Sequence, residues 1–186
     1  IPESLYLVKT DSQDGLNLED LNLLPKNPNW ANNWDTLYKV SEEEAHNLAE
    51  EFMSNRMLNY KDGRDFPATN NTSFLSPYLH FGLISPKQIY FKSMIFGCNE
   101  GLTSFLSEIG WREFSYHLLY HFADLPTKNF KPKFDNFAWN NDQENLKKWQ
   151  KGMTGFPLID AGMRQLWQTG WMHNRVRMVV ASFATK

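Results

Sequence analysis

The feature of this sequence that most constrains its fold is a series of helix start and stop signals with no strand pattern between them. Residues suited to capping a helix N-terminus precede apolar residues spaced three and four apart, the spacing of one helix face. Gly or Pro follows where a helix has to end or turn. No stretch alternates apolar and polar residues over a useful length, as a half-buried strand would. The sequence therefore predicts an all-α fold.

Six helices are expected, and capping residues, Pro and Gly set most of their ends. Ser41 and Glu44 match a capping box, in which each side chain binds the backbone N–H of the other residue. Turn-forming residues fill 63–76 and 124–141, which we expect to be loops. The expected helix starts are Ser41, Ser85, Thr103, Asp142, Pro157 and Met172, and the expected ends lie near Met57, Gly97, Tyr120, Gly152 and Gly170.

Residues 1–40 differ from the rest because they are rich in Asn, Asp and Pro and show little periodicity. We therefore divide the chain into an extended strap, residues 1–40, and a helical domain, residues 41–186. The first residue is not Met, and the last ones lie inside an apolar periodic stretch, so we expect a fragment truncated at both ends. The side chains expected to pin the strap to a surface are Leu21, Leu23, Leu24, Trp30 and Trp34.

Composition excludes several classes of protein. The net charge of −2 lacks the basic excess of many nucleic-acid-binding domains, and the lysines at 128, 131 and 133 are expected in a solvated loop. The single Cys98 excludes an internal disulfide and suits a reducing cytoplasm, where we expect the protein. No window approaches a membrane span and no charged-then-apolar signal opens the chain, so neither a membrane span nor a signal peptide is expected in these residues. The His residues, including His117 and His121, lack a metal-ligand partner, so no metal site is expected.

The segment from Trp171 to Met178 carries the most specific polar pattern. Asn174, Arg177 and Met178 share one helix face, and the apolar residues around them predict that this face is partly buried. An amide, a guanidinium and a thioether on one wall would suit an uncharged aromatic ligand. A core helix with a satisfied Asn and a surface Arg explains the pattern equally well. His173 is assigned a structural role.

A second stripe lies on the helix expected from Thr103, where Glu108, Trp111, Arg112 and Ser115 share one face. An exposed indole offers a stacking surface for a nucleic-acid base, worth about 1–3 kcal/mol, and a carboxylate accepts hydrogen bonds from a base edge. The alternative is an ordinary Glu108–Arg112 ion pair beside a core Trp, worth a few tenths of a kcal/mol.

Five ordered blocks resemble DNA photolyases and cryptochromes, and class I cyclobutane pyrimidine dimer photolyases most closely. The blocks are 60–67 (YKDGRDFP), 72–79 (TSFLSPYL), 108–114 (EIGWREF), 155–164 (GFPLIDAGMR) and 171–178 (WMHNRVRM). The resemblance implies a partial helical FAD-binding domain, with residues 1–40 leading from an N-terminal antenna domain absent from this chain. A folate or deazaflavin antenna chromophore is possible in the parent protein. Both Asn174 and Met178 resemble dimer photolyases, whereas related enzymes for other lesions usually carry His at these positions.

The resemblance also implies roles for individual residues. Those implied to hold FAD are Tyr60, Thr72, Ser73, Phe74, Leu75, Ser76, Phe105, Glu108, Arg112, Ser115, Trp171, Asn174 and Arg177. Those implied to contact DNA are Arg64, Glu108, Trp111, Asn174 and Arg175. Those implied to take part in catalysis are Glu108, Trp111, Asn174 and Met178, with Trp139 as the exposed end of an electron-transfer chain. Many relatives carry Arg where Phe74 stands, which puts charge compensation of the cofactor diphosphate at that position in doubt. The inner tryptophans and the Asp partner of Arg177 would lie beyond Lys186.

The activity implied is light-driven repair of cyclobutane pyrimidine dimers in double-stranded DNA, a carbon–carbon lyase reaction driven by an electron from reduced FAD. We expect the stripe with Trp111 and the turn with Asn174 to lie on opposite sides of one cleft, which receives the flipped-out dimer. The parent protein is expected to be a monomer, and residues 1–186 alone are expected to be inactive and to retain FAD weakly. The alternatives are a cryptochrome-type blue-light receptor and a non-enzymatic helical DNA-binding module.

Overall fold

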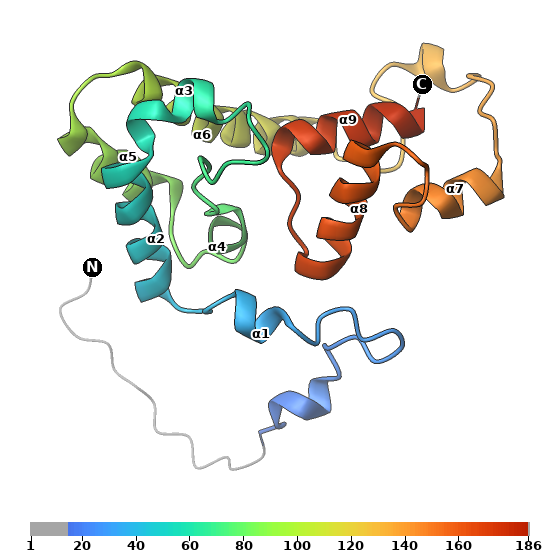
Figure 1. The fold of residues 1–186 in the computed structure, drawn as a ribbon, viewed down its shortest axis with the longest axis horizontal. Coiled ribbons are helices and arrows are strands. Elements are labelled where there is room, and N and C mark those ends of the chain that lie inside the picture. The colour runs from blue at the N-terminus through green and yellow to red at the C-terminus, as the bar shows by residue number, and fades with distance from the viewer. Residues whose placement is uncertain (1–14, 186) are drawn as a thin grey trace.

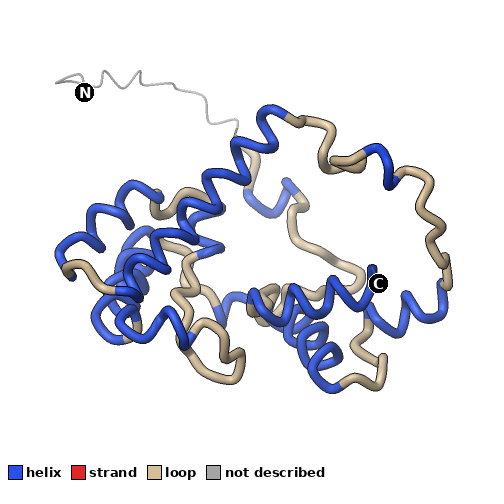
Figure 2. Tube along the Cα trace, turned by 90° about the horizontal axis from the view of Figure 1, so that it is seen from above, coloured by secondary structure: helices blue, strands red, loops and turns tan. Residues whose placement is uncertain are grey.

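The computed structural model describes residues 15–185, and every regular element in that range is helical, as the sequence predicts. Figure 1 shows two groups of helices side by side: α2–α6, in cyan to yellow, and α7–α9, in orange and red. Seen from above, the long loop between α6 and α7 connects the two groups (Figure 2). Within residues 15–185, no helix is both long and apolar enough to span a membrane.

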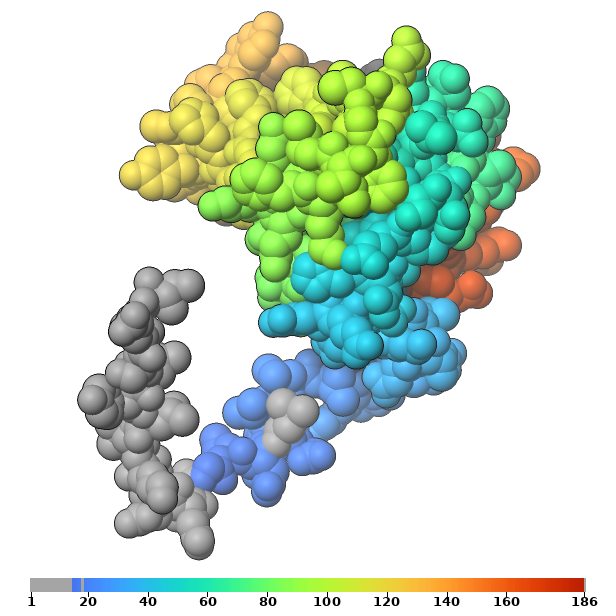
Figure 3. All heavy atoms as spheres, turned by 90° about the vertical axis from the view of Figure 1, so that its left-hand side faces the viewer, coloured from blue at the N-terminus to red at the C-terminus, as the bar shows by residue number. Residues whose placement is uncertain are grey.

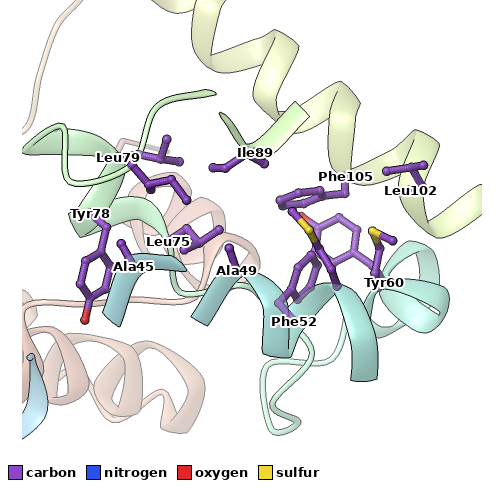
Figure 4. Close-up of a cluster of buried hydrophobic side chains, with 13 residues drawn as sticks. Ala45, Ala49, Phe52, Tyr60, Leu75, Tyr78, Leu79, Ile89, Leu102 and Phe105 are labelled. Atoms are coloured by element: carbon purple, nitrogen blue, oxygen red, sulfur yellow. The ribbon is translucent and has the colours of Figure 1, made fainter. Parts of the chain in front are cut away.

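The first group is held together by the larger of two hydrophobic cores. Its elements are α2 (Glu42–Asn55), η2 (Met57–Asn59), α3 (Tyr60–Gly63), α4 (Ser76–His80), α5 (Pro86–Ser93), η3 (Met94–Phe96) and α6 (Glu100–His121). The fully buried Phe52 ring lies 5.5 Å from the Tyr60 ring and 4.7 Å from the Phe105 ring (Figure 4). A Cβ on Gly101 would lie 1.9 Å from the carbonyl oxygen of Met57, so α6 approaches η2 this closely because the residue is Gly.

The second group has a smaller core between α7 (Gln143–Gln150), α8 (Pro157–Thr169) and α9 (Asn174–Thr185). The Val176 side chain packs over Gly162, where a Cβ would lie 2.4 Å from a Val176 methyl carbon. Trp149 joins α7 to this core because its indole N–H donates to the carbonyl of Val180 at 3.1 Å. Its buried residues are Ile159, Met163, Met172, Val176 and Val180.

The strap crosses beneath both groups and contains η1 (Leu18–Leu21) and α1 (Trp34–Leu37). Figure 3 shows it in blue below α2. Aromatic residues hold it against the end of α8: a Cβ on Gly170 would lie 2.4 Å from a carbon of the Trp34 ring, and the Tyr38 hydroxyl donates to the carbonyl of Thr169 at 2.7 Å.

The prediction that leucines pin the strap is wrong for Leu21, Leu23 and Leu24, which are exposed. The physical reason is that the strap is fixed by the large Trp and Tyr rings against the end of α8, which leaves the leucines between η1 and α1 facing outward. The part of the predicted strap before residue 15 lies outside the described residues.

Most helix ends follow the sequence signals. Ser41 caps α2 because its hydroxyl accepts from the N–H of Glu44 at 3.0 Å, although the reciprocal capping-box bond is not formed among the described residues. That reciprocal pair occurs instead at Ser85 and Gln88, at 3.1 and 2.8 Å. The Asp142 carboxylate caps α7, and Gly170 ends α8 in the left-handed conformation, both as expected.

Other helix ends correct the prediction. Asn99 caps α6 through a 2.8 Å bond from the N–H of Leu102, so this helix begins at Glu100 and Thr103 lies inside it. An Asn side chain is as good a cap as Thr, and it comes first along the chain. α2 ends at Asn55, two residues before the expected end, and α9 starts at Asn174. The short helices α1, α3 and α4 were not expected, because too few residues lie in each to show a period.

Candidate functional site

A groove between α4 and α6 brings together three of the residues implied to hold a cofactor. Ser76, Arg112 and Ser115 line a cavity of about 380 Å³. Leu79 and Leu119 add apolar wall to it. This volume lies near the lower end of the range for ligand pockets, about 300–1,000 Å³, so it suits part of a dinucleotide.

Arg112 is fixed in this groove by neighbours other than the one expected. Its guanidinium donates to the carbonyl of Leu79 and to the Tyr116 hydroxyl, both at 3.3 Å, and lies 4.7 Å from the centre of the Tyr116 ring. It also pairs with Glu113 at 2.9 Å. The Glu108–Arg112 ion pair considered from the sequence is not formed. The Arg112 guanidinium and the two serine hydroxyls suit an anionic group, and the apolar side chains beside them suit a flat aromatic ring. FAD contains both kinds of group.

The turn from Thr72 to Ser76 joins the two helical groups. Phe74 adopts a left-handed backbone with φ of 56°, and its ring lies 4.5 Å from that of Trp171. A basic side chain at this turn is Arg56, which donates to the carbonyl of Thr72 at 2.9 Å and also pairs with Glu51. Arg56 was not predicted from the sequence, because its position after α2 does not indicate a contact with Thr72, 16 residues later.

Three residues implied to contact the cofactor belong to the core. Tyr60, Leu75 and Phe105 are 8%, 1% and 4% exposed, which leaves little side-chain surface for a ligand. Burial raises the pKa of the Tyr60 hydroxyl, while the nearby positive charge of Arg64 opposes that rise. Leu75 and Phe105 both belong to the larger hydrophobic core, where the Phe105 ring lies 4.7 Å from the Phe52 ring of α2.

A row of charged residues connects α6 to α9. Arg64 Nη1 donates to Glu108 Oε1 at 2.5 Å, and Arg175 Nε donates to Asp65 Oδ1 at 2.7 Å. Because Arg64 and Asp65 are adjacent, these two ion pairs link the first turn of α9 to the middle of α6. Trp111, one turn beyond Glu108, is 62% exposed. Two ion pairs in series thus link the elements that carry Trp111 and Asn174, and neither of these residues lines the cavities of about 380 or 650 Å³.

The predicted burial of the polar face of α9 is wrong. Asn174, Arg177 and Met178 are exposed. The reason is that α9 packs on α8 through Val176 and Val180, which turns the face of Asn174 and Met178 away from that core. Arg177 bonds to the carbonyl of Met172 at 3.2 Å.

His173, next to this face, is 2% exposed. Its Nδ1 accepts from the backbone N–H of Arg175 at 3.2 Å, while its Nε2 is buried and has no partner within residues 15–185. Burial lowers the pKa of this imidazole, and the charge of Arg175 lowers it further. The structural role assigned from the sequence agrees with this burial.

Trp139 lies far along the chain from these contacts, at the edge of another cavity. It is 54% exposed and lines a space of about 650 Å³ together with Trp149, Phe156 and Phe183. An exposed indole at a cavity rim is accessible to an external electron donor.

No cluster of three or more metal-ligating side chains occurs in the described part of the chain. His117 and His121 stack with their ring centres 4.3 Å apart on α6. The lysine loop is solvated as expected: Lys128, Lys131 and Lys133 are exposed, and Lys128 pairs with Asp124 at 2.6 Å.

The fold and this site define an all-helical domain suited to a dinucleotide with an aromatic ring. Residues 105–186 match the family model described as the FAD binding domain of DNA photolyase. A deoxyribodipyrimidine photo-lyase of Agrobacterium fabrum is 45% identical over 172 residues, which cover 91% of this chain and 36% of that protein. Cryptochrome-2 of Arabidopsis thaliana is 39% identical over 152 residues, covering 76% of this chain and 25% of that protein.

The fold agrees with a solved relative as well. The crystal structure of a bacterial class III photolyase from Agrobacterium tumefaciens superposes with a TM-score of 0.84 at 45% identity, covering 90% of this chain and 36% of that chain. The chain therefore belongs to the family of DNA photolyases and cryptochromes. It spans about a third of the length of the curated photolyases it matches. The comparisons show the family, and the class I assignment stays a prediction.

Proposed function

We propose that this chain forms part of a flavoprotein that repairs cyclobutane pyrimidine dimers in double-stranded DNA under light. The observation that carries the proposal is the pair formed by Glu108 and Trp111 on α6. Their side chains lie one turn apart, Trp111 is 62% exposed, and the Glu108 carboxylate is held by Arg64. An exposed indole has no role in the hydrophobic core, whereas it offers a flat surface on which a flipped base stacks.

The residues of this chain bind, orient and exclude water around the reacting groups. FAD, when bound in its reduced form, supplies the light-driven electron that splits the dimer. Ser76, Ser115 and Arg112 line the groove that would hold part of the cofactor. Trp111 would stack on the dimer, and the Glu108 carboxylate would accept hydrogen bonds from its base edge. We further propose that Asn174 and Met178 face the same ligands, and that Trp139 passes electrons inward.

The test compares repair of a duplex carrying one cyclobutane thymine dimer in blue light and in darkness. We expect repair only in light. Trp111→Ala is expected to weaken binding of the damaged duplex about 5- to 150-fold, because stacking on an aromatic ring contributes about 1–3 kcal/mol. The matched control is Trp167→Ala, which removes another exposed indole, on α8. Equal loss in both variants, or repair in darkness, would contradict the proposal.

A blue-light receptor is the second candidate, because cryptochromes are among the relatives of this chain. It predicts flavin photoreduction without preference for the damaged duplex. A non-enzymatic DNA-binding module predicts that the protein binds no flavin at all. We also propose a monomeric protein located in the cytoplasm, where the exposed thiol of Cys98 would stay reduced.

A further inference from the structure

Arg64 makes contacts that do not suit a phosphate-binding arginine. It follows α3, and its guanidinium carbon lies 5.4 Å from the centre of the Tyr60 ring. Its Nη1 donates to the carboxylate of Glu108 at 2.5 Å, and its side chain is 15% exposed. The ring covers one face of the guanidinium and the carboxylate binds one end, so little of its donor surface remains for DNA.

The contact orients Glu108 in a specific way. The bond engages Oε1, and among residues 15–185 no partner occupies Oε2, which is left to accept from a ligand. The Glu108 side chain is 34% exposed, more than twice the exposed fraction of its partner. The carboxylate is therefore held at Oε1 by Arg64, while Oε2 is left for a ligand on the face of α6 that Glu108 shares with Trp111.

We propose that Arg64 is a positioning residue for recognition of the damaged base, acting through Glu108 rather than through a DNA phosphate. This inference rests on the proposed function. A flexible carboxylate loses rotamer freedom when it binds a base edge, and a partner that fixes it beforehand removes that cost. The fork of a guanidinium suits this task because it binds the carboxylate while packing flat on an aromatic ring.

Arg175 provides an internal contrast. It belongs to the neighbouring ion pair with Asp65, and its side chain is 40% exposed against 15% for Arg64. Its Nε binds Asp65 and its Nη1 contacts Met178 Sδ at 3.7 Å, whereas Nη2 forms no hydrogen bond within residues 15–185, so Arg175 remains suited to a phosphate. The two arginines implied to contact DNA are thus assigned different roles by their burial.

The experiment measures binding of two duplexes, one with a single cyclobutane thymine dimer and one undamaged, as a function of salt concentration. We expect Arg64→Gln to lower the ratio of damaged to undamaged affinity about tenfold or more, as expected for impairing a hydrogen bond to a charged acceptor. Its salt dependence should match that of the wild type. Glu108→Gln should lower the ratio similarly, and the double variant should be no worse than the weaker single one.

Lys61→Gln is the matched control, since it removes one positive charge three residues before Arg64, at an exposed site in α3 paired with Glu100. It should leave the ratio unchanged. Arg64→Lys keeps the charge without the fork, so its ratio should fall between wild type and Arg64→Gln. This variant carries the test if Arg64→Gln does not fold, because a phosphate contact predicts wild-type behaviour for Arg64→Lys.

Two results would overturn the inference. One is equal loss of affinity for both duplexes in Arg64→Gln, with the slope of log K against log salt smaller by about one unit, the mark of a lost phosphate contact. The other is an Arg64→Lys variant that matches the wild type. A wild-type protein that does not prefer the damaged duplex would instead overturn the proposed function itself.

Discussion

The contact between α8 and α9 gives the sharpest prediction about stability. A Cβ added at Gly162 would lie 2.4 Å from a methyl carbon of Val176 and 3.3 Å from one of Val180. Both distances are shorter than ordinary carbon contacts, and Val176 is buried on the core face of α9. Gly162→Ala therefore forces the two helices apart or Val176 out of its rotamer, and overpacking of this kind costs about 1–3 kcal/mol.

Helix propensity acts in the opposite direction. Replacing Gly by Ala within a helix contributes up to about 1 kcal/mol. Gly110 in α6 isolates this effect, because nothing lies within 4 Å of the Cβ that Ala would add there. We expect Gly110→Ala to stabilise the protein and Gly162→Ala to be less stable than Gly110→Ala by the overpacking cost, about 1–3 kcal/mol.

A double-mutant cycle tests the cause directly, with urea unfolding midpoints as the measurement. Val176→Ala alone should destabilise by about 2 kcal/mol, since it removes two buried methyl-sized groups. In the Gly162→Ala background the same change should cost less, because the new methyl fills the space, with a coupling of about 1 kcal/mol or more. Additive effects, or a Gly162→Ala variant as stable as Gly110→Ala, would refute the reasoning.

Three further predictions concern backbone strain and pH. The free energy of unfolding, measured with urea, should be about 1 kcal/mol higher for Phe74→Gly than for Phe74→Ala. Both variants lose the ring, but Gly adopts the left-handed backbone of this position without strain. Burial holds the pKa of His173 below its value of about 6.5 in the unfolded state. The unfolded state therefore binds more protons, and the stability of the folded protein falls as the pH drops below about 6.5. Urea midpoints measured between about pH 8 and pH 5 should show this decline in the wild type and not in His173→Gln. Burial raises the pKa of Asp160, but bonds from Thr154 and Gly155 outweigh it and hold the pKa below its ordinary value. The ionised Asp160 therefore stabilises the protein above the pKa that it has in the unfolded state, and this stability is lost as the pH falls through its pKa in the folded state. In a plot of urea midpoint against pH, Asp160→Asn should therefore decline less at acid pH than the wild type. An equal decline in both proteins would contradict this.

The sequence by itself determined that the described part of the chain is helical and roughly where its longer helices lie. Capping residues such as Ser41 and Asp142, and the stop at Gly170, act on backbone groups within a few residues. Signals of this range can be read without knowing the rest of the fold. The five ordered blocks likewise sufficed to indicate the family, which the comparisons show.

Only the tertiary structure decided which faces are buried and which charges meet. Glu108 is four residues from Arg112 but pairs with Arg64, 44 residues away in sequence. Asn174 and Met178 are exposed because Gly162 on α8 admits Val176 on the opposite side of α9. Helix periodicity specifies that residues share a face, but the direction of that face depends on the shape of the helix packed against it.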